Sequence, residues 1–312
     1  MDKKPLFVLF LFLIPAWIVA QDLEYARGIV NTLASAELKG RGYVGRGDLK
    51  AAQFIGDEFK KIGLRPIKKS FFQKFNTPVN TFPAKMKLCV DGKELVPGED
   101  FIIEPGSPSL SGIFPTIHLE VPDILNQEVL LGKLKESKGK FIVVGPYNRK
   151  DFSKEEQKQI EDLINFLKYH PENPAEGTVL LTNNKLTWSA STVQYRKPTF
   201  IVENKKVNFK ESIETLFLEV EGKFFEKYKS QNVLGYIEGE EPDSLMVFIA
   251  HYDHLGMMGS NTVFPGANDN ASGVAMLLNL AKYYALNKPK YRSLFIAFGG
   301  EELGLIGSKY FV

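Results

Sequence analysis

Three short polar segments in the C-terminal third of the sequence contain residue types that bind metals and move protons. They are HYDHLG at residues 251–256, GANDNASG at 266–273 and FGGEELG at 298–304. Imidazole nitrogens and carboxylate oxygens are common protein ligands of zinc. Each segment alone is modest evidence for a metal site, but their order and placement along the chain make the joint evidence much stronger.

The first segment pairs a histidine with a carboxylate. His251 and Asp253 are two residues apart, so they share a face of an extended chain. The carboxylate is then able to hold one ring nitrogen while the other nitrogen binds a metal. His254 is expected to point elsewhere if the strand continues. A lone histidine at a strand end more often has a structural role than a metal-binding one. The aspartate two residues later makes metal binding only moderately more favoured.

The other two segments place carboxylates beside glycine or at a helix start. Asp269 stands just before a predicted helix, where aspartate usually serves as the N-cap. Asn270 and Ser272 are equally good caps, which leaves Asp269 free for another role. Neighbouring carboxylates such as Glu301 and Glu302 usually lie on a solvated face. Here they follow a buried strand and are flanked by glycines, which permit a tight backbone and one shared pocket.

An α/β pattern positions all three segments. The apolar run 245–250 predicts a strand buried on both faces, 271–286 predicts a helix with one apolar face, and 294–298 predicts a second buried strand. Residues 233–237 predict a further strand. Strand, helix and strand in this order predict a parallel pair with a crossover. Ligands of such sheets bind beyond the carboxyl ends of the strands, where the polar segments begin.

The preceding part of the chain divides into two regions. Residues 48–62 predict an amphipathic helix that ends at Gly63. The Gly- and Arg-rich stretch 39–47 lacks the strand and glycine pattern of a phosphate-binding loop, so we predict a plain loop. From residue 68 to 225, short apolar runs alternate with turn residues and predict a β-rich domain. Its predicted strands are 101–103, 141–144 and 178–181, with one helix over 154–169.

Composition excludes some functional classes. The 312 residues include 39 basic and 37 acidic side chains, a net charge of +2, which argues against a nucleic-acid-binding protein. Cys89 is the only cysteine, so no intrachain disulfide forms. It lies in an apolar stretch and is predicted to be a buried small side chain rather than a nucleophile.

The N-terminus has the pattern of a secretory signal peptide. Lys3 and Lys4 precede an apolar run over residues 5–20. The run is short for a membrane span, which takes about 20 apolar residues, and Pro15 interrupts it. We predict cleavage after Ala20 and a secreted or periplasmic location, with no membrane contact beyond the signal peptide. An uncleaved N-terminal anchor is the alternative.

Together the three segments resemble those of the co-catalytic di-zinc exopeptidase family, which includes secreted bacterial aminopeptidases, glutamate carboxypeptidase and glutaminyl cyclase. The resemblance is specific over residues 232–312 and looser over 22–66. The region between resembles a protease-associated domain. The implied fold is α/β, a mixed sheet flanked by helices and interrupted by a smaller β-rich domain. The implied divisions are a signal peptide at 1–20, peptidase parts at 21–67 and 226–312, and an insertion at 68–225.

The resemblance also implies roles for individual residues. His251 is expected to bind one zinc ion with Asp253 orienting it, Asp269 to bridge two zinc ions, and Glu302 to bind the second. Glu301 is the expected general base. The peptide bond that follows Asp269 is expected to be cis. The substrate is expected to be a peptide, hydrolysed at its N-terminal bond.

The family supplies two further zinc ligands, an aspartate and a histidine, downstream of the position where this sequence ends at Val312. The final strands and helices are therefore expected to be missing, with an apolar patch and an open sheet edge exposed. The chain alone is expected to be an inactive fragment that binds zinc poorly. Two alternatives share the scaffold: a non-catalytic binding protein, against which the presence of Glu301 argues, and a glutaminyl cyclase, against which the insertion argues.

Overall fold

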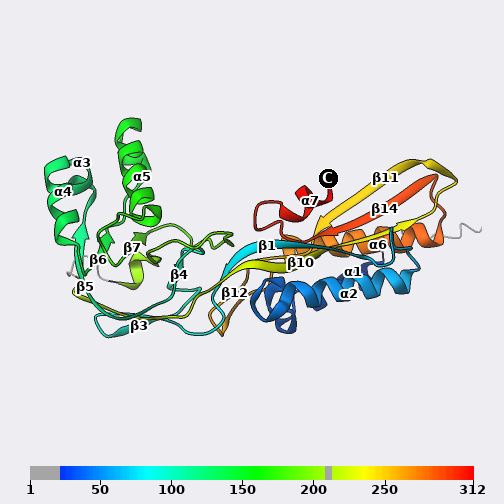
Figure 1. Ribbon diagram of the computed structural model, residues 1–312, viewed down its shortest axis with the longest axis horizontal. Coiled ribbons are helices and arrows are strands. Elements are labelled where there is room, and N and C mark those ends of the chain that lie inside the picture. Colours follow the sequence, from blue (N-terminus) through cyan, green and yellow to red (C-terminus); the bar gives the residue numbers. More distant parts are fainter. Residues whose placement is uncertain (1–21, 208–212) are drawn as a thin grey trace, which may run out of the picture.

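The computed structural model describes residues 22–207 and 213–312, so the predicted signal peptide at 1–20 lies outside the described residues. Two parts lie side by side, joined by a long pair of antiparallel strands (Figure 1). In the described part of the chain, no helix combines the length and the apolarity needed to cross a bilayer.

The first part is built on a four-stranded mixed sheet in the order β1-β10-β14-β11. Its strands are β1 (Phe72–Thr81), β10 (Lys223–Ile237), β11 (Glu241–His251) and β14 (Tyr291–Phe298). As predicted, β11 and β14 are parallel, and the intervening helix α6 (Ser272–Leu286) makes the crossover. The other pairs are antiparallel.

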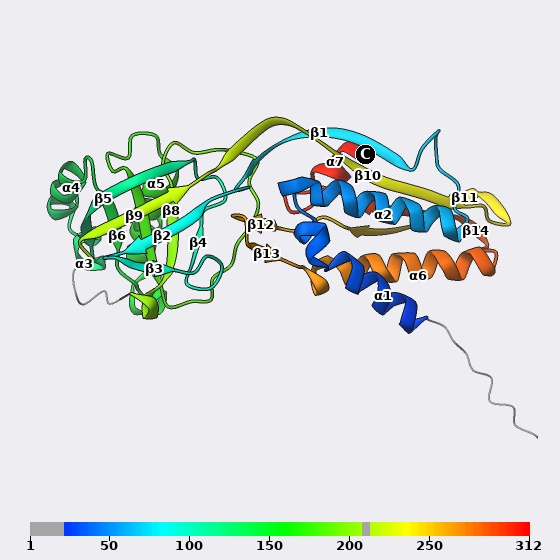
Figure 2. The ribbon, with the colours of Figure 1, turned by 90° about the horizontal axis from the view of Figure 1, so that it is seen from below.

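Helices cover both faces of this sheet. Helices α1 (Leu23–Leu33), α2 (Gly47–Ile62) and α6 lie on one face, and the short α7 (Ile306–Phe311) lies on the other (Figures 1 and 2). The predicted helix over 48–62 is confirmed. Ile55 and Phe59 of α2 are fully buried, and Gly63 ends the helix with a positive φ of 97°.

The second part is an eight-stranded sheet in the order β3-β2-β9-β5-β6-β7-β8-β4. The predicted helix over 154–169 is present as α5 (Lys154–Tyr169), which begins with a Ser153–Glu156 capping box. The strands are β2 (Met86–Val90), β3 (Lys93–Leu95), β4 (Phe101–Ile103), β5 (Leu110–Leu119), β6 (Phe141–Val144), β7 (Gly177–Thr182), β8 (Thr199–Glu203) and β9 (Thr215–Val220), and the remaining helices are α3 (Val121–Leu125) and α4 (Gln127–Glu136).

The strands place the edges of the insertion differently from the predicted range 68–225. Strand β1 pairs with β10 in the four-stranded sheet, and the eight-stranded sheet begins at Met86 and ends at Val220. The sequence does not distinguish the two cases, because a strand with alternating apolar and polar residues has the same pattern whichever sheet it joins. Long-range pairing, which leaves no local mark in the sequence, decides the sheet that a strand joins.

Strand β11 forms one end of the four-stranded sheet and is rich in exposed apolar side chains. Leu245 and Ile249 are 57% and 65% exposed, and Met246 and Val247 are also exposed. An exposed apolar edge of this kind invites pairing with another chain.

Candidate metal centre

The metal-binding candidates gather where the parallel strands β11 and β14 end. The last residue of β11, His251, lies opposite Phe298, the last residue of β14. Two parallel neighbours that end in register direct their following loops to the same edge. The loop with Asp253 therefore meets the loop with Glu301 and Glu302.

Short distances show that the predicted residues come together. The Nε2 atom of His251 lies 3.3 Å from Oδ1 of Asp269, and its Nδ1 atom lies 3.9 Å from Oε2 of Glu301. Glu302 lies beside His254, with 2.7 Å between Oε1 and Nδ1. Asp269 is mostly exposed, whereas His251 and Glu302 are largely covered, so the group forms a partly sheltered site open on one side.

The donor set suits zinc. Two groups of described residues offer three ligand atoms each, and within each group the atoms lie within 4.8 Å of one another. One group is His251, Glu301 and Glu302, and the other is His254, Asp269 and Glu302. Imidazole nitrogen with carboxylate oxygen is an ordinary ligand combination for zinc. Glu302 belongs to both groups, so two neighbouring ions could share this edge of the sheet.

His254 corrects one expectation. The sequence predicted that it points away from the site if the strand continues, but the strand ends at His251. Alternation of side chains holds only along a strand. The chain turns after His251, and His254 is buried with its ring against Glu302. The signal that it belongs to the site was present in the sequence as the second histidine of HYDHLG.

Asp253 contacts the site differently from the expected carboxylate–imidazole pair. Its Oδ1 atom is 4.0 Å from Nδ1 of His251, beyond hydrogen-bond distance, and its backbone carbonyl lies 3.2 Å from that nitrogen instead. The carboxylate accepts hydrogen bonds from the backbone N–H groups of Glu301 and Glu302, at 3.1 and 3.3 Å. Burial raises the pKa of Asp253 to about 6, while the Glu301 N–H and His251 act to lower it. Asp253 thus fixes the backbone that carries both glutamates.

Asp269 is free of the capping role, as the sequence suggested. The side-chain oxygen of Asn270 accepts the N–H of Gly273 at 3.0 Å, in the manner of a helix cap. Gly266 adopts a positive φ of 58° at the start of this turn. The peptide bond between Asp269 and Asn270 is cis, which confirms that prediction.

Arg41 supports the site from beneath, a role that the sequence did not reveal. Its side chain is fully buried, and burial lowers its pKa to about 10, against the raising effect of Asp253, Asp269 and Glu302. Arg41 belongs to the stretch 39–47, which was predicted to be a loop without a binding role. Its guanidinium connects this stretch by hydrogen bonds to the two segments that carry His251 and Asp269. It donates to the carbonyls of Leu33 at 2.9 Å, Tyr252, Pro265 and Gly266 at 2.7 Å, and Asp269 at 3.2 Å.

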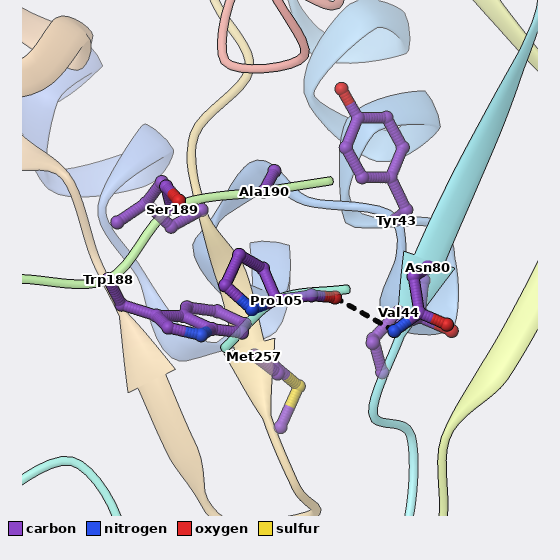
Figure 3. Close-up of a pocket in the computed structure, with 10 residues that line it drawn as sticks. Tyr43, Val44, Asn80, Pro105, Trp188, Ser189, Ala190 and Met257 are labelled. Atoms are coloured by element: carbon purple, nitrogen blue, oxygen red, sulfur yellow. Dashed lines mark hydrogen bonds between the residues drawn. The ribbon is translucent and has the colours of Figure 1, made fainter. Parts of the chain in front are cut away.

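The insertion also reaches this region. Ala190 packs against a buried cluster that contains Tyr43 and Leu303, the residue that follows Glu302. The Tyr43 hydroxyl donates to Oδ2 of Asp253 at 3.2 Å. Figure 3 shows Tyr43 and Ala190 at a small cavity between the two parts, about 20 Å³ in volume and large enough for a water molecule. One wall is Asn80, whose side chain donates to the Pro105 carbonyl at 2.8 Å.

Comparison with known proteins gives a family match for the part of the chain that carries the site. Residues 232–312 match the model of Peptidase family M28. A fungal protein from Pyricularia oryzae, named as a probable zinc metalloprotease, is 40% identical over 85 residues, which are 26% of this chain and 17% of that protein. Aminopeptidase YwaD of Bacillus subtilis is 39% identical over 93 residues, 29% of this chain and 19% of that protein. The family resemblance seen in the sequence is thereby confirmed.

Solved structures share the fold over most of the chain. A zinc aminopeptidase from Bacillus subtilis has a TM-score of 0.61 at 20% identity, covering 92% of this chain and 64% of that one. A peptidase M28 precursor from Shewanella amazonensis has a TM-score of 0.63 at 17% identity, covering 94% and 67%. The predicted α/β fold with a flanked mixed sheet is confirmed. The chain spans under a fifth of the length of the two curated relatives described above.

Proposed function

We propose that this protein is a zinc-dependent exopeptidase, and more specifically an aminopeptidase that acts on peptides outside the cytoplasm. The observation that carries the proposal is the gathering of two histidines and three carboxylates at one sheet edge, in two groups that share Glu302. The family match over residues 232–312 and the zinc peptidases among the relatives support it.

The geometry supports a role for each of these residues. We assign His251, Asp269 and Glu302 as zinc ligands, as the resemblance implied, and add His254 because its Nδ1 atom lies within 2.7 Å of Glu302. Asp269 would hold zinc as the resemblance implies, and its place supports this, since it lies 3.3 Å from His251 and also belongs to the group around His254. Bound zinc supplies Lewis-acid chemistry and lowers the pKa of a coordinated water.

Glu301 is the proposed general base. Its carboxylate lies 3.9 Å from His251, and its side chain is 37% exposed, so it reaches the open side of the site. A carboxylate in this position takes a proton from the attacking water and passes it to the leaving amine. Asp253, fully buried beneath it, holds the Glu301 backbone N–H and so sets the direction of the side chain.

The test compares substrates that separate the alternatives. We would assay leucyl-anilide hydrolysis, cyclisation of N-terminal glutamine and zinc content of the purified protein. Aminopeptidase activity with bound zinc is the expected result. Bound zinc without turnover of either substrate would favour a binding protein, and cyclisation alone would favour a glutaminyl cyclase.

Export is a separate part of the proposal, supported by the basic start and apolar run of residues 1–20. Mass spectrometry of the protein recovered outside the cytoplasm should give an N-terminus at Gln21. Recovery of a protein that retains residues 1–20 would support the uncleaved anchor instead.

A further inference from the structure

A second concave site includes Tyr43, the residue whose hydroxyl contacts Asp253 of the metal centre. It is a groove of about 480 Å³ between the loop at residues 43–46, the chain around Thr81 and Pro83, and residues 223–229 of β10. These segments lie near the end of the β1–β10 strand pair, where it passes from the first part toward the second (Figure 2). The metal-centre residues do not line it.

A local irregularity in β10 creates the aromatic floor of this groove. The pairing with β1 shifts between Thr77↔Tyr228 and Val79↔Phe225, so β10 has one more residue than β1 at this point. Such a bulge breaks the strict alternation of side chains. Phe225 and Tyr228 therefore both line the groove, with ring centroids 5.7 Å apart, and Tyr43 lies 5.2 Å from Tyr228.

The aromatic floor is held in place from below. The Tyr228 hydroxyl donates to the buried carboxylate of Asp48 at 2.6 Å, and the Ser230 hydroxyl donates to the same carboxylate at 3.0 Å. Both oxygens of Asp48 are therefore occupied beneath the floor, and Asp48 does not line the groove. Glu226, although adjacent to Phe225 in sequence, does not line it either.

Four cations surround the floor: Arg46, Lys223, Lys227 and Lys229. Arg46 lies 4.8 Å over the Tyr228 ring and donates to the Lys229 carbonyl at 3.1 Å, and Lys223 lies 4.9 Å over the Phe225 ring. None of the four forms an ion pair with a carboxylate of the described residues, and no acidic side chain lines the groove. The charged side chains that line the groove are thus all cations, and two of them lie over aromatic rings.

We propose that this groove binds a short acidic peptide segment. Cations without carboxylate partners attract carboxylates, and the aromatic floor offers contact area for peptide groups between them. The volume suits a few residues rather than a nucleic-acid duplex, and the whole chain has a net charge of only +2, without the excess basic charge of a nucleic-acid-binding protein. This inference is independent of the proposed peptidase activity.

The experiment measures binding of a fluorescein-labelled hexapeptide of aspartate and glutamate by anisotropy, using the full chain. The peptide is N-acetylated, so it lacks the free amine that an aminopeptidase requires. A matched hexapeptide of asparagine and glutamine serves as the uncharged control. We expect measurable binding of the acidic peptide only, weakening as ionic strength rises from about 0.05 M to about 0.5 M.

Variants locate the binding. The double variant Lys227→Gln, Lys229→Gln should lower the affinity for the acidic peptide by about three- to tenfold, because two exposed charge contacts are lost. The control Lys150→Gln with Lys185→Gln removes the same charge from exposed positions of the insertion and should leave binding unchanged. Circular dichroism and the melting temperature verify that both double variants are folded.

Several results would overturn the proposal. Equal binding of the charged and uncharged peptides would do so, as would equal losses in the two double variants. Tighter binding of a short single-stranded DNA of the same charge would show a general polyanion site instead of a peptide site. Because the probe has no free amine, failure here leaves the peptidase proposal intact, and loss of zinc-dependent turnover leaves this one intact.

Discussion

The metal centre and the basic groove both involve Tyr43, which contacts Asp253 and lines the groove, but their charged groups are held in different ways. The centre is held by buried charged groups, Asp253 and Arg41, whose polar atoms are occupied by backbone partners. The groove is formed by exposed lysines, with Arg46 and Lys223 placed over aromatic rings. A buried charge is costly unless every hydrogen bond is made. The centre is therefore expected to tolerate little change, whereas the exposed cations of the groove should be replaceable without loss of stability.

The largest expected effect is on catalysis and concerns Glu301. Glu301→Gln should lower turnover by roughly 10²–10⁴-fold, because an amide does not accept the proton. Zinc content, measured by atomic emission, should stay unchanged if Glu301 is a base and not a ligand. Near-normal turnover would place the base elsewhere, and loss of zinc would make Glu301 a ligand, as the group with His251 and Glu302 permits.

The next effect is on stability and concerns Arg41. Arg41→Met keeps an unbranched chain but leaves five carbonyls without their donor, two in buried contacts and three in partly buried ones. The free energy of unfolding should fall by about 3–5 kcal/mol, as for other broken buried charge networks. Urea denaturation without zinc measures this directly. A decrease in the free energy of unfolding of less than about 1 kcal/mol would show that water replaces the guanidinium as hydrogen-bond donor. The contrast between a centre that tolerates little change and a tolerant groove would then be wrong.

A smaller effect is expected at Asp253. Asp253→Asn keeps one acceptor oxygen, so one of the two backbone N–H groups of Glu301 and Glu302 loses its partner. Zinc affinity should weaken by about 10–100-fold, the usual effect of removing a group that orients metal ligands. Isothermal titration with zinc tests this, with Asp91→Asn, on an exposed turn of the insertion, as the matched control. Equal affinities of the two variants would contradict the positioning role.

The smallest effect is expected on stability when two lysines of the groove are replaced. Lys227→Gln with Lys229→Gln should change the free energy of unfolding by less than about 0.5 kcal/mol, since both side chains are exposed and neither forms an ion pair with the described residues. The same urea titration used for Arg41→Met measures it. A loss of several kcal/mol would mean that the groove lysines are structural, and the contrast between the two regions would disappear.

Local patterns were sufficient to predict several elements. The helical spacing of Ile160, Leu163 and Leu167 predicted the helix that the structure has over Lys154–Tyr169. The unbroken apolar runs before His251 and Gly299 predicted the two parallel strands, and hence the edge where the site lies. These succeed because helical periodicity and burial on both faces are properties of neighbouring residues.

What the sequence alone determined was the chemistry of the residues: the histidines and carboxylates of three segments, their place after buried strands, and a freely available Asp269. Only the tertiary structure decided which atoms meet. It turned His254 toward Glu302, gave the Asp253 carboxylate to the Glu301 and Glu302 backbone, and brought Arg41 beneath loops more than two hundred residues away in sequence. It also placed β1 in the four-stranded sheet. Contacts of this kind depend on pairing and packing between distant segments, which leave no periodic signal in the sequence.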